Sequence, residues 1–140
     1  MIFLKKHNIT LSTLLLTAAV FSNAAQANVV DIVINNVTDV DLILVSESTY
    51  DKFPTTIPAK RKEPVTLYMG GTRSDIEVVY KRSDSGAACH FTTSHIEQVS
   101  GPYFDKSATS IGTPMATCSA YQTPTWRPPY NYKAEFAFYN

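Results

Sequence analysis

The residues best suited to binding chemistry lie together near the C-terminus, in residues 123–132. This segment, TPTWRPPYNY, holds the only tryptophan of the chain, Trp126, with Arg127, Tyr130 and Tyr132 beside it. Its three prolines exclude a helix and leave few backbone donors for a sheet, so we expect it to run extended over the surface. Aromatic side chains with a polar tip suit protein interfaces, sugar faces and membrane boundaries. The segment therefore predicts a binding surface or, alternatively, a cover over one open end of the core.

A second candidate is a cluster of three basic residues, Lys60, Arg61 and Lys62, bounded by two prolines. Three adjacent cations at the tip of a loop suit contact with phosphate, a sulfated sugar or a lipid headgroup. The same pattern also suits a solvated turn. We include the cluster in the candidate site on the condition that its loop meets the aromatic segment.

Residues for metal binding or catalysis are sparse. His90 and His95 are the only histidines after residue 27, and on one strand they would point to opposite faces. Together with Glu97 or Asp84 they match no recognised metal-ligand spacing, so we predict surface histidines, no metal site and no cofactor. No Gly-x-Ser-x-Gly elbow is present in the sequence. A small hydrolase stays open as an alternative, and it would require a concave site with a perturbed carboxylate or histidine.

The two cysteines, Cys89 and Cys118, form an isolated pair. Their separation is far from the C-x-x-C spacing of redox and metal pairs. In an exported protein such a pair is most simply a disulfide. Closing a segment of about 30 residues would stabilise the fold by roughly 3 to 4 kcal/mol in the loop-entropy model.

Residues 1–27 have the features of a cleaved signal peptide. A lysine pair precedes an apolar and small-residue run, residues 9–21, and the small-x-small sequence Ala25-Gln26-Ala27 follows. The run is shorter than the roughly 20 residues that span a bilayer, although an uncleaved anchor is the alternative. We predict cleavage before Asn28 and bacterial export to the periplasm or the medium.

Removal of these residues leaves one domain, residues 28–140. Two of the 12 basic residues leave with the signal peptide and all 12 acidic residues stay, so the net charge becomes −2. A near-neutral domain has no electrostatic reason to bind nucleic acid. The domain also lacks a second apolar run long enough for a transmembrane segment.

Period-two alternation of apolar residues predicts strands through most of this domain. The clearest pattern is a hairpin over residues 74–93, with a turn at Ser83-Asp84-Ser85-Gly86 in which Gly86 supplies a positive φ. An opening hairpin is expected from residues 28–37 and 40–45. Further strands are expected at residues 65–69, 115–121 and 132–139. Residues 100–114 contain two glycines and two prolines among small polar residues, so we expect a long loop there.

About seven short strands separated by turn residues predict an all-β fold, a small antiparallel sandwich with one disulfide. A small closed barrel is the alternative. We expect a non-enzymatic exported binding protein whose loops, at one end of the sandwich, contact a protein, a glycan or a lipid headgroup at a membrane surface. One alternative is an inhibitor or effector that acts on a host or competitor protein through a protruding loop such as residues 101–114. The other is the small secreted hydrolase.

Overall fold

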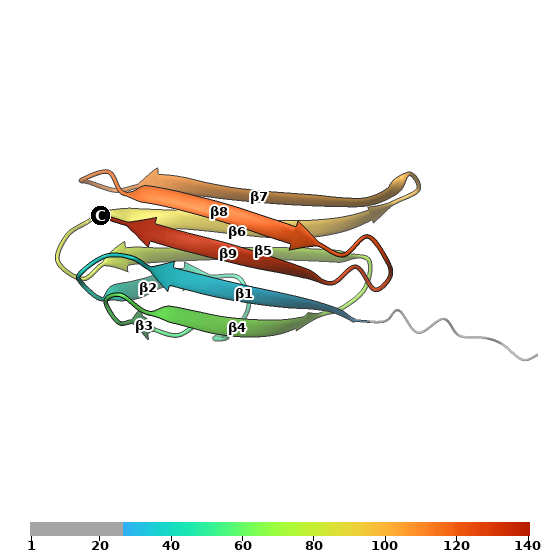
Figure 1. Ribbon diagram of the computed structural model, residues 1–140, viewed down its shortest axis with the longest axis horizontal. Coiled ribbons are helices and arrows are strands. Elements are labelled where there is room, and N and C mark those ends of the chain that lie inside the picture. The colour runs from blue at the N-terminus through green and yellow to red at the C-terminus, as the bar shows by residue number, and fades with distance from the viewer. Residues whose placement is uncertain (1–26) are drawn as a thin grey trace, which may run out of the picture.

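Nine β-strands make up the fold in the computed structural model, which describes residues 27–140 and contains no helix within them. They form two sheets packed face to face (Figure 1). Sheet A has the order β4 (Lys62–Met69), β1 (Asn28–Asn36), β9 (Tyr132–Tyr139) and β8 (Thr117–Pro124). Sheet B has the order β3 (Thr56–Ile57), β2 (Leu42–Glu47), β5 (Arg73–Arg82), β6 (Ala88–Gln98) and β7 (Gly101–Ile111). The predicted sandwich is confirmed, and the closed barrel is wrong because each sheet keeps two edge strands.

The core lies between the sheets and follows the alternation of the sequence. Strand β9 buries Tyr132, Ala134, Phe136 and Phe138 toward sheet B, while the residues between Tyr132 and Phe136 face outward. The ring of Phe136 stacks on that of Phe91 from β6, with centroids 4.9 Å apart. A fully buried side chain of this size contributes about 1.5 to 3 kcal/mol, so the two inner faces hold the layers together.

The first and last strands lie side by side in the middle of sheet A. Strand β9 pairs with β1 in parallel, with Val30 beside Tyr132 and Ile34 beside Phe136, and it pairs with β8 on its other edge. The strand predicted at residues 132–139 is therefore confirmed. It is the strand that joins β8 to the rest of the sheet.

The predicted opening hairpin is wrong, because β1 and β2 belong to different sheets. The chain crosses between them at Asn36, whose side chain is fully buried. Its amide nitrogen donates to the carbonyl oxygens of Val40 at 2.9 Å and Ile57 at 3.1 Å. Its oxygen accepts from the backbone N–H of Thr38 at 3.0 Å and from the Thr38 hydroxyl at 2.8 Å. These bonds fix a corner where the sequence pattern indicated only a turn.

The hairpin of β5 and β6 is confirmed, although Gly86 is required for a different reason than predicted. Its φ is not positive; instead, a Cβ at this position would lie 2.7 Å from the carbonyl oxygen of Thr113. The neighbouring turn has the positive φ, at Gly112, where a Cβ would lie 2.1 Å from the Gly86 oxygen. The two turns therefore meet through their backbones, and neither glycine has room for a side chain.

The long loop expected at residues 100–114 is wrong over most of its length. Residues Gly101–Ile111 form β7, and all eleven of them pair with β6 in unbroken register. The strand is an edge strand with most of its side chains exposed, so it needs no alternation of apolar residues. Small and polar residues such as Ser107 and Thr109 suffice there, which is why periodicity missed it.

The predicted disulfide is confirmed between Cys89 on β6 and Cys118 on β8, with Cα atoms 5.8 Å apart. It joins sheet B to sheet A on the side where the edge strands β7 and β8 lie next to each other (Figure 1). The predicted signal peptide lies outside the described residues except for Ala27. Within residues 27–140 no helix is long and apolar enough to cross a membrane.

Replacing both cysteines with alanine should lower the free energy of unfolding by about 3 kcal/mol, because the bond closes a loop of 29 residues in the unfolded chain. Urea unfolding followed by circular dichroism measures this loss. Wild-type protein reduced with dithiothreitol is the control and should unfold at the same urea concentration as the double variant. Equal midpoints for the oxidised wild type and the double variant would contradict the prediction.

Candidate binding surface

The aromatic segment divides between two strand ends and a loop. Residues 125–131, here called the aromatic loop, connect β8 to β9. The backbone N–H of Thr125 donates to the Asn131 carbonyl at 2.8 Å, and the N–H of Tyr130 donates to the Arg127 carbonyl at 2.8 Å. The Asn131 side chain accepts from the backbone N–H of Val29 at 2.8 Å, which ties the loop to β1. The loop is therefore held in one conformation before any ligand arrives.

Trp126 is the exposed aromatic residue of this loop. Its side chain is 65% exposed, and its ring packs perpendicular to that of Phe104 of β7, with centroids 5.2 Å apart and planes at 83°. Arg127 is also exposed. Because most of the Trp126 side chain stays exposed beside this contact, Trp126 and Arg127 form the accessible part of the predicted site.

The two tyrosines of the segment cover the core instead. Tyr132 is 2% exposed, and its hydroxyl lies 3.0 Å from the Ser74 hydroxyl of β5. Burial raises the pKa of Tyr132. Tyr130 is half-buried against the ring of His95, at 5.3 Å between centroids. Tyr130 and Tyr132 therefore close the end of the core, as the alternative prediction has it, while Trp126 faces outward and its binding role stays a prediction.

The basic cluster lies at the other end of the sandwich. Lys62 pairs with Asn35, near the end of β1, whereas the aromatic loop is tied to Val29 at its start. Six strand residues separate these points by about 20 Å. The condition that the two loops meet is therefore not fulfilled, and the inclusion of Lys60, Arg61 and Lys62 in one site with Trp126 is wrong.

Two of these three cations make contacts within the fold. The Lys60 ammonium donates to the Val37 carbonyl at 2.6 Å, next to the corner between β1 and β2. Lys62 forms an ion pair with Glu135 of β9 at 3.2 Å. The cluster therefore matches the solvated-turn interpretation better than a free patch of positive charge.

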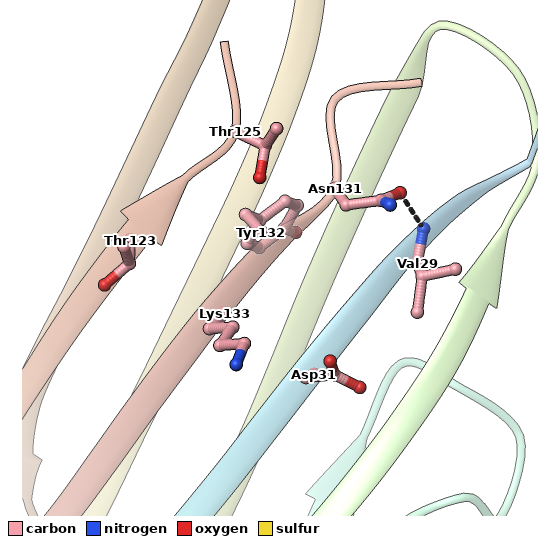
Figure 2. A pocket seen from close by; sticks show the side chains of 7 residues that line it. All are labelled: Val29, Asp31, Thr123, Thr125, Asn131, Tyr132 and Lys133. Carbon is pink, nitrogen blue, oxygen red and sulfur yellow. Dashed lines mark hydrogen bonds between the residues drawn. The ribbon is translucent and has the colours of Figure 1, made fainter. Parts of the chain in front are cut away.

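A hollow of about 380 Å³ lies on the outer face of sheet A at the base of the aromatic loop. We call it the polar hollow; it is lined by Val29, Asp31, Thr123, Thr125, Asn131, Tyr132 and Lys133. Figure 2 shows these side chains and the bond from Asn131 to β1. The Asp31 carboxylate also accepts from the Thr66 hydroxyl at 2.7 Å. Hydroxyl, amide, carboxylate and ammonium groups thus surround one small space.

The sequence did not reveal this hollow. Asp31 and Lys133 become neighbours only because β1 and β9 pair in parallel, with these two residues opposite each other in the register. Alternation would have placed both residues on an outer face. Nothing in the local sequence indicated which strands would be adjacent.

The prediction of surface histidines holds for His90 and is wrong for His95. His90 is partly exposed and lies 3.0 Å from Glu77 on the outer face of sheet B. His95 is 1% exposed, with its ring between those of Phe104 at 5.0 Å and Tyr130 at 5.3 Å. Neither ring nitrogen of His95 has a hydrogen-bond partner within the described residues, and burial lowers its pKa. A neutral imidazole therefore supports the aromatic loop from below.

The described part of the chain contains no group of three or more histidine, cysteine, aspartate or glutamate side chains placed to hold a metal ion. Comparison with known protein families finds no family model that matches the sequence, and comparison with curated proteins finds no significant match. The site must therefore be interpreted from its own geometry.

Acid should weaken the packing beneath the aromatic loop. The pKa of His95 is lowered in the folded state, so the unfolded chain takes up the proton first as the pH falls below the ordinary value of 6.5. Stability should then fall by at most about 1.4 kcal/mol per pH unit until the folded histidine also titrates. Among charged groups, the carboxylate of Glu97 on the same strand opposes this shift, because it favours the protonated imidazole.

Unfolding free energies at pH 7.5 and pH 5.5, followed through Trp126 fluorescence, measure this effect. The variant His95→Phe keeps a flat ring without unpaired nitrogens, so it should unfold at a higher urea concentration at pH 5.5 and lose much of the pH dependence. His90→Gln is the matched control and should keep the dependence of the wild type. An unchanged pH dependence in His95→Phe would assign the effect to another group.

Proposed function

We propose that this chain is an exported, non-enzymatic binding protein that takes a glycan at the aromatic loop and the adjoining polar hollow. The observation that carries the proposal is the exposure of Trp126 on a loop that is hydrogen-bonded at both ends. A side chain fixed in its binding position loses little conformational entropy when a ligand arrives. A ligand with little charge gains little from electrostatic attraction, so it depends on a binding side chain that is already in position, as Trp126 is.

The chemistry around Trp126 suits a sugar. A pyranose ring has an apolar C–H face, which packs on an aromatic ring, and an edge of hydroxyl groups, which need hydrogen-bond partners. Trp126 offers the aromatic ring, while Asp31 and Lys133 offer an acceptor and a donor in the polar hollow. Thr125 lines the hollow and directly precedes Trp126, so an oligosaccharide of a few units is long enough to contact both.

Other ligand classes receive less support from the described residues. A lipid headgroup is held best by a cluster of cations, and the aromatic loop carries Arg127, whereas Lys60 and Lys62 lie at the opposite end and make contacts within the fold. An inhibitor acting through a loop at residues 101–114 loses its basis, because Gly101–Ile111 is the strand β7. A hydrolase would need a perturbed carboxylate or histidine in a concave site, and His95, whose pKa is lowered, does not line the polar hollow. Tyr132, whose pKa is raised, lines it, but its hydroxyl lies in the core beside Ser74.

Export is the second part of the proposal. The signal-like sequence ends at Ala27, and β1 begins at the next residue, Asn28, which is buried in the fold. A disulfide between the sheets also suits an oxidising compartment. Expression of the full chain in a bacterium should therefore yield, in the periplasm or the medium, a protein that lacks residues 1–27. Intact mass spectrometry of the recovered protein measures this, and a mass that retains those residues would contradict the predicted cleavage.

The glycan proposal predicts a specific loss of binding at Trp126. A panel of immobilised neutral and acidic oligosaccharides serves as the first probe, and the best binder is then titrated in solution by calorimetry. Trp126→Ala should weaken binding about 30-fold, the effect of losing a 2 kcal/mol hot-spot residue. Trp126→Phe should lose less, because a smaller aromatic ring remains.

Met115→Ala is the matched control for this experiment. Met115 is an exposed apolar residue, 84% accessible, in the turn between β7 and β8 at the opposite end of the sandwich, so its removal should leave binding unchanged. Retention of no oligosaccharide by the wild type, or equal affinities for wild type and Trp126→Ala, would overturn the proposal.

A further inference from the structure

A second concave surface lies between the edge of sheet A and the loop that follows β2. We call it the edge groove; it has a volume of about 540 Å³. Residues Thr66, Leu67, Tyr68 and Met69 of β4 form one side, and Ser48, Thr49, Tyr50 and Lys52 form the other. No sequence motif indicated this groove, and neither Trp126 nor Arg127 lines it.

The backbone of β4 has unused hydrogen-bonding groups on the side of the groove. The backbone N–H of Asn36 donates to the carbonyl of Arg61, the residue before β4. Because backbone groups alternate in direction along a strand, Ile34, Ile32 and Val30 of β1 also turn their N–H and C=O groups toward β4. Their register partners on β4 include Val65 and Leu67. The residues between these, including Thr66 and Tyr68, therefore point their N–H and C=O groups away from β1. No backbone partner for them is found within residues 27–140.

Only the first half of this edge is protected against another strand. Lys62 and Pro64 are residues that natural edge strands use to prevent pairing, and Pro64 lacks the N–H that would point outward. Residues Thr66–Met69 contain no lysine, no proline and no bulge. In the opposite sheet the edge strand β3 has only two residues and pairs with β2, so within the described residues no strand pairs with the outer edge of β4.

The walls of the edge groove carry two strongly exposed tyrosines. Tyr50 is 93% exposed and Tyr68 is 77% exposed, whereas Leu67 is 4% exposed and points to the opposite face of β4, into the core. Two exposed aromatic rings on the walls of one groove suit an apolar side chain. Among the described residues that line the groove, Lys52 carries the one charge, so a ligand with a negative group near Lys52 is complementary.

Tyr50 is held in its exposed position at a cost in backbone energy. Tyr50 and Asp51 have φ values of 56° and 62°, a left-handed conformation that residues other than glycine rarely adopt. The carboxylate of Glu47 fixes the turn by accepting hydrogen bonds from the Thr49 hydroxyl and from the backbone N–H of Lys52 at 3.3 Å. Strain that the surrounding contacts maintain at an exposed aromatic residue is typical of binding sites.

We propose that the edge groove binds an extended peptide of a partner protein, which adds to β4 as a fifth strand of sheet A along Thr66–Met69. Its backbone bonds to the outward groups of Thr66 and Tyr68, an apolar side chain lies against the exposed rings of Tyr50 and Tyr68, and a carboxylate lies next to Lys52. A single extended chain fits beside β4, whereas the sheet edge of a second copy would meet the loop of residues 48–52. This site shares no lining residue with the polar hollow, although the Thr66 hydroxyl donates to Asp31 of that hollow, and the peptide proposal does not depend on the glycan proposal.

The test uses an array of eight-residue peptides in which every second residue is valine, isoleucine or phenylalanine, each made with and without an aspartate at the C-terminal end. The best binder is labelled and titrated by fluorescence polarisation against the cleaved, disulfide-bonded protein. N-methylation of alternate amides in that peptide should weaken binding at least tenfold in one of the two alternations, because only one set of amides faces β4.

Three variants examine the three parts of the site. Thr66→Pro removes an outward N–H as Pro64 already does two residues earlier, and it should weaken binding about tenfold. Lys52→Glu should weaken only the peptides that carry aspartate. Tyr50→Gly relieves the left-handed backbone strain, so this variant should unfold at a higher urea concentration than the wild type. It should nevertheless bind the peptide at least fivefold more weakly, so the loss of binding cannot be attributed to a loss of folding.

Met115→Ala should bind the peptide like the wild type, and Tyr50→Gly should bind oligosaccharides like the wild type. The proposal is overturned if no array peptide binds above background, or if Thr66→Pro and Tyr50→Gly bind as the wild type does. Analytical ultracentrifugation adds a further outcome. Dimerisation of the wild type that Thr66→Pro abolishes would show that a second copy occupies the edge, and would also overturn the peptide proposal.

Discussion

The parallel pairing of β1 with β9 is the constraint on which the rest of the structure depends. It places the two ends of the domain in the middle of sheet A and leaves β4 and β8 as the edges. The aromatic loop is held because Asn131 lies beside Val29, and the polar hollow exists because Lys133 lies beside Asp31. The disulfide fixes the start of β8 to sheet B, at the end of the strand opposite to the aromatic loop.

Much of the strand content could be predicted from the sequence, because strands with one buried face alternate in polarity. This holds for β9 and for the β5–β6 hairpin, whose inward side chains fill the core. It fails for β7, an exposed edge strand whose small residues carry no alternation. Alternation also does not predict which strands pair. The inward residues of β1 would suit a place beside several strands, and only the hydrogen bonds of Asn36 turn the chain so that β1 and β2 enter different sheets.

The candidate site could be predicted only where residue type alone was informative. Trp126 and Arg127 stood out by composition, and the structure exposes both of them. The burial of His95 could not be foreseen, since it follows from Phe104 and Tyr130, which arrive from other elements. The edge groove was missed for the same reason, because Tyr50 and Tyr68 belong to separate segments that meet only across the gap between the sheets.

The corner at Asn36 also restricts how the protein can be produced. Asn36-Val37-Thr38 matches the acceptor sequence for N-linked glycosylation in eukaryotic secretion. Both the Asn36 amide and the Thr38 hydroxyl are buried and engaged in the hydrogen bonds that turn the chain from one sheet to the other. A sugar attached to this nitrogen before folding would have no space in the corner. A eukaryotic secretory host is therefore unsuited to this chain unless it folds faster than it is modified.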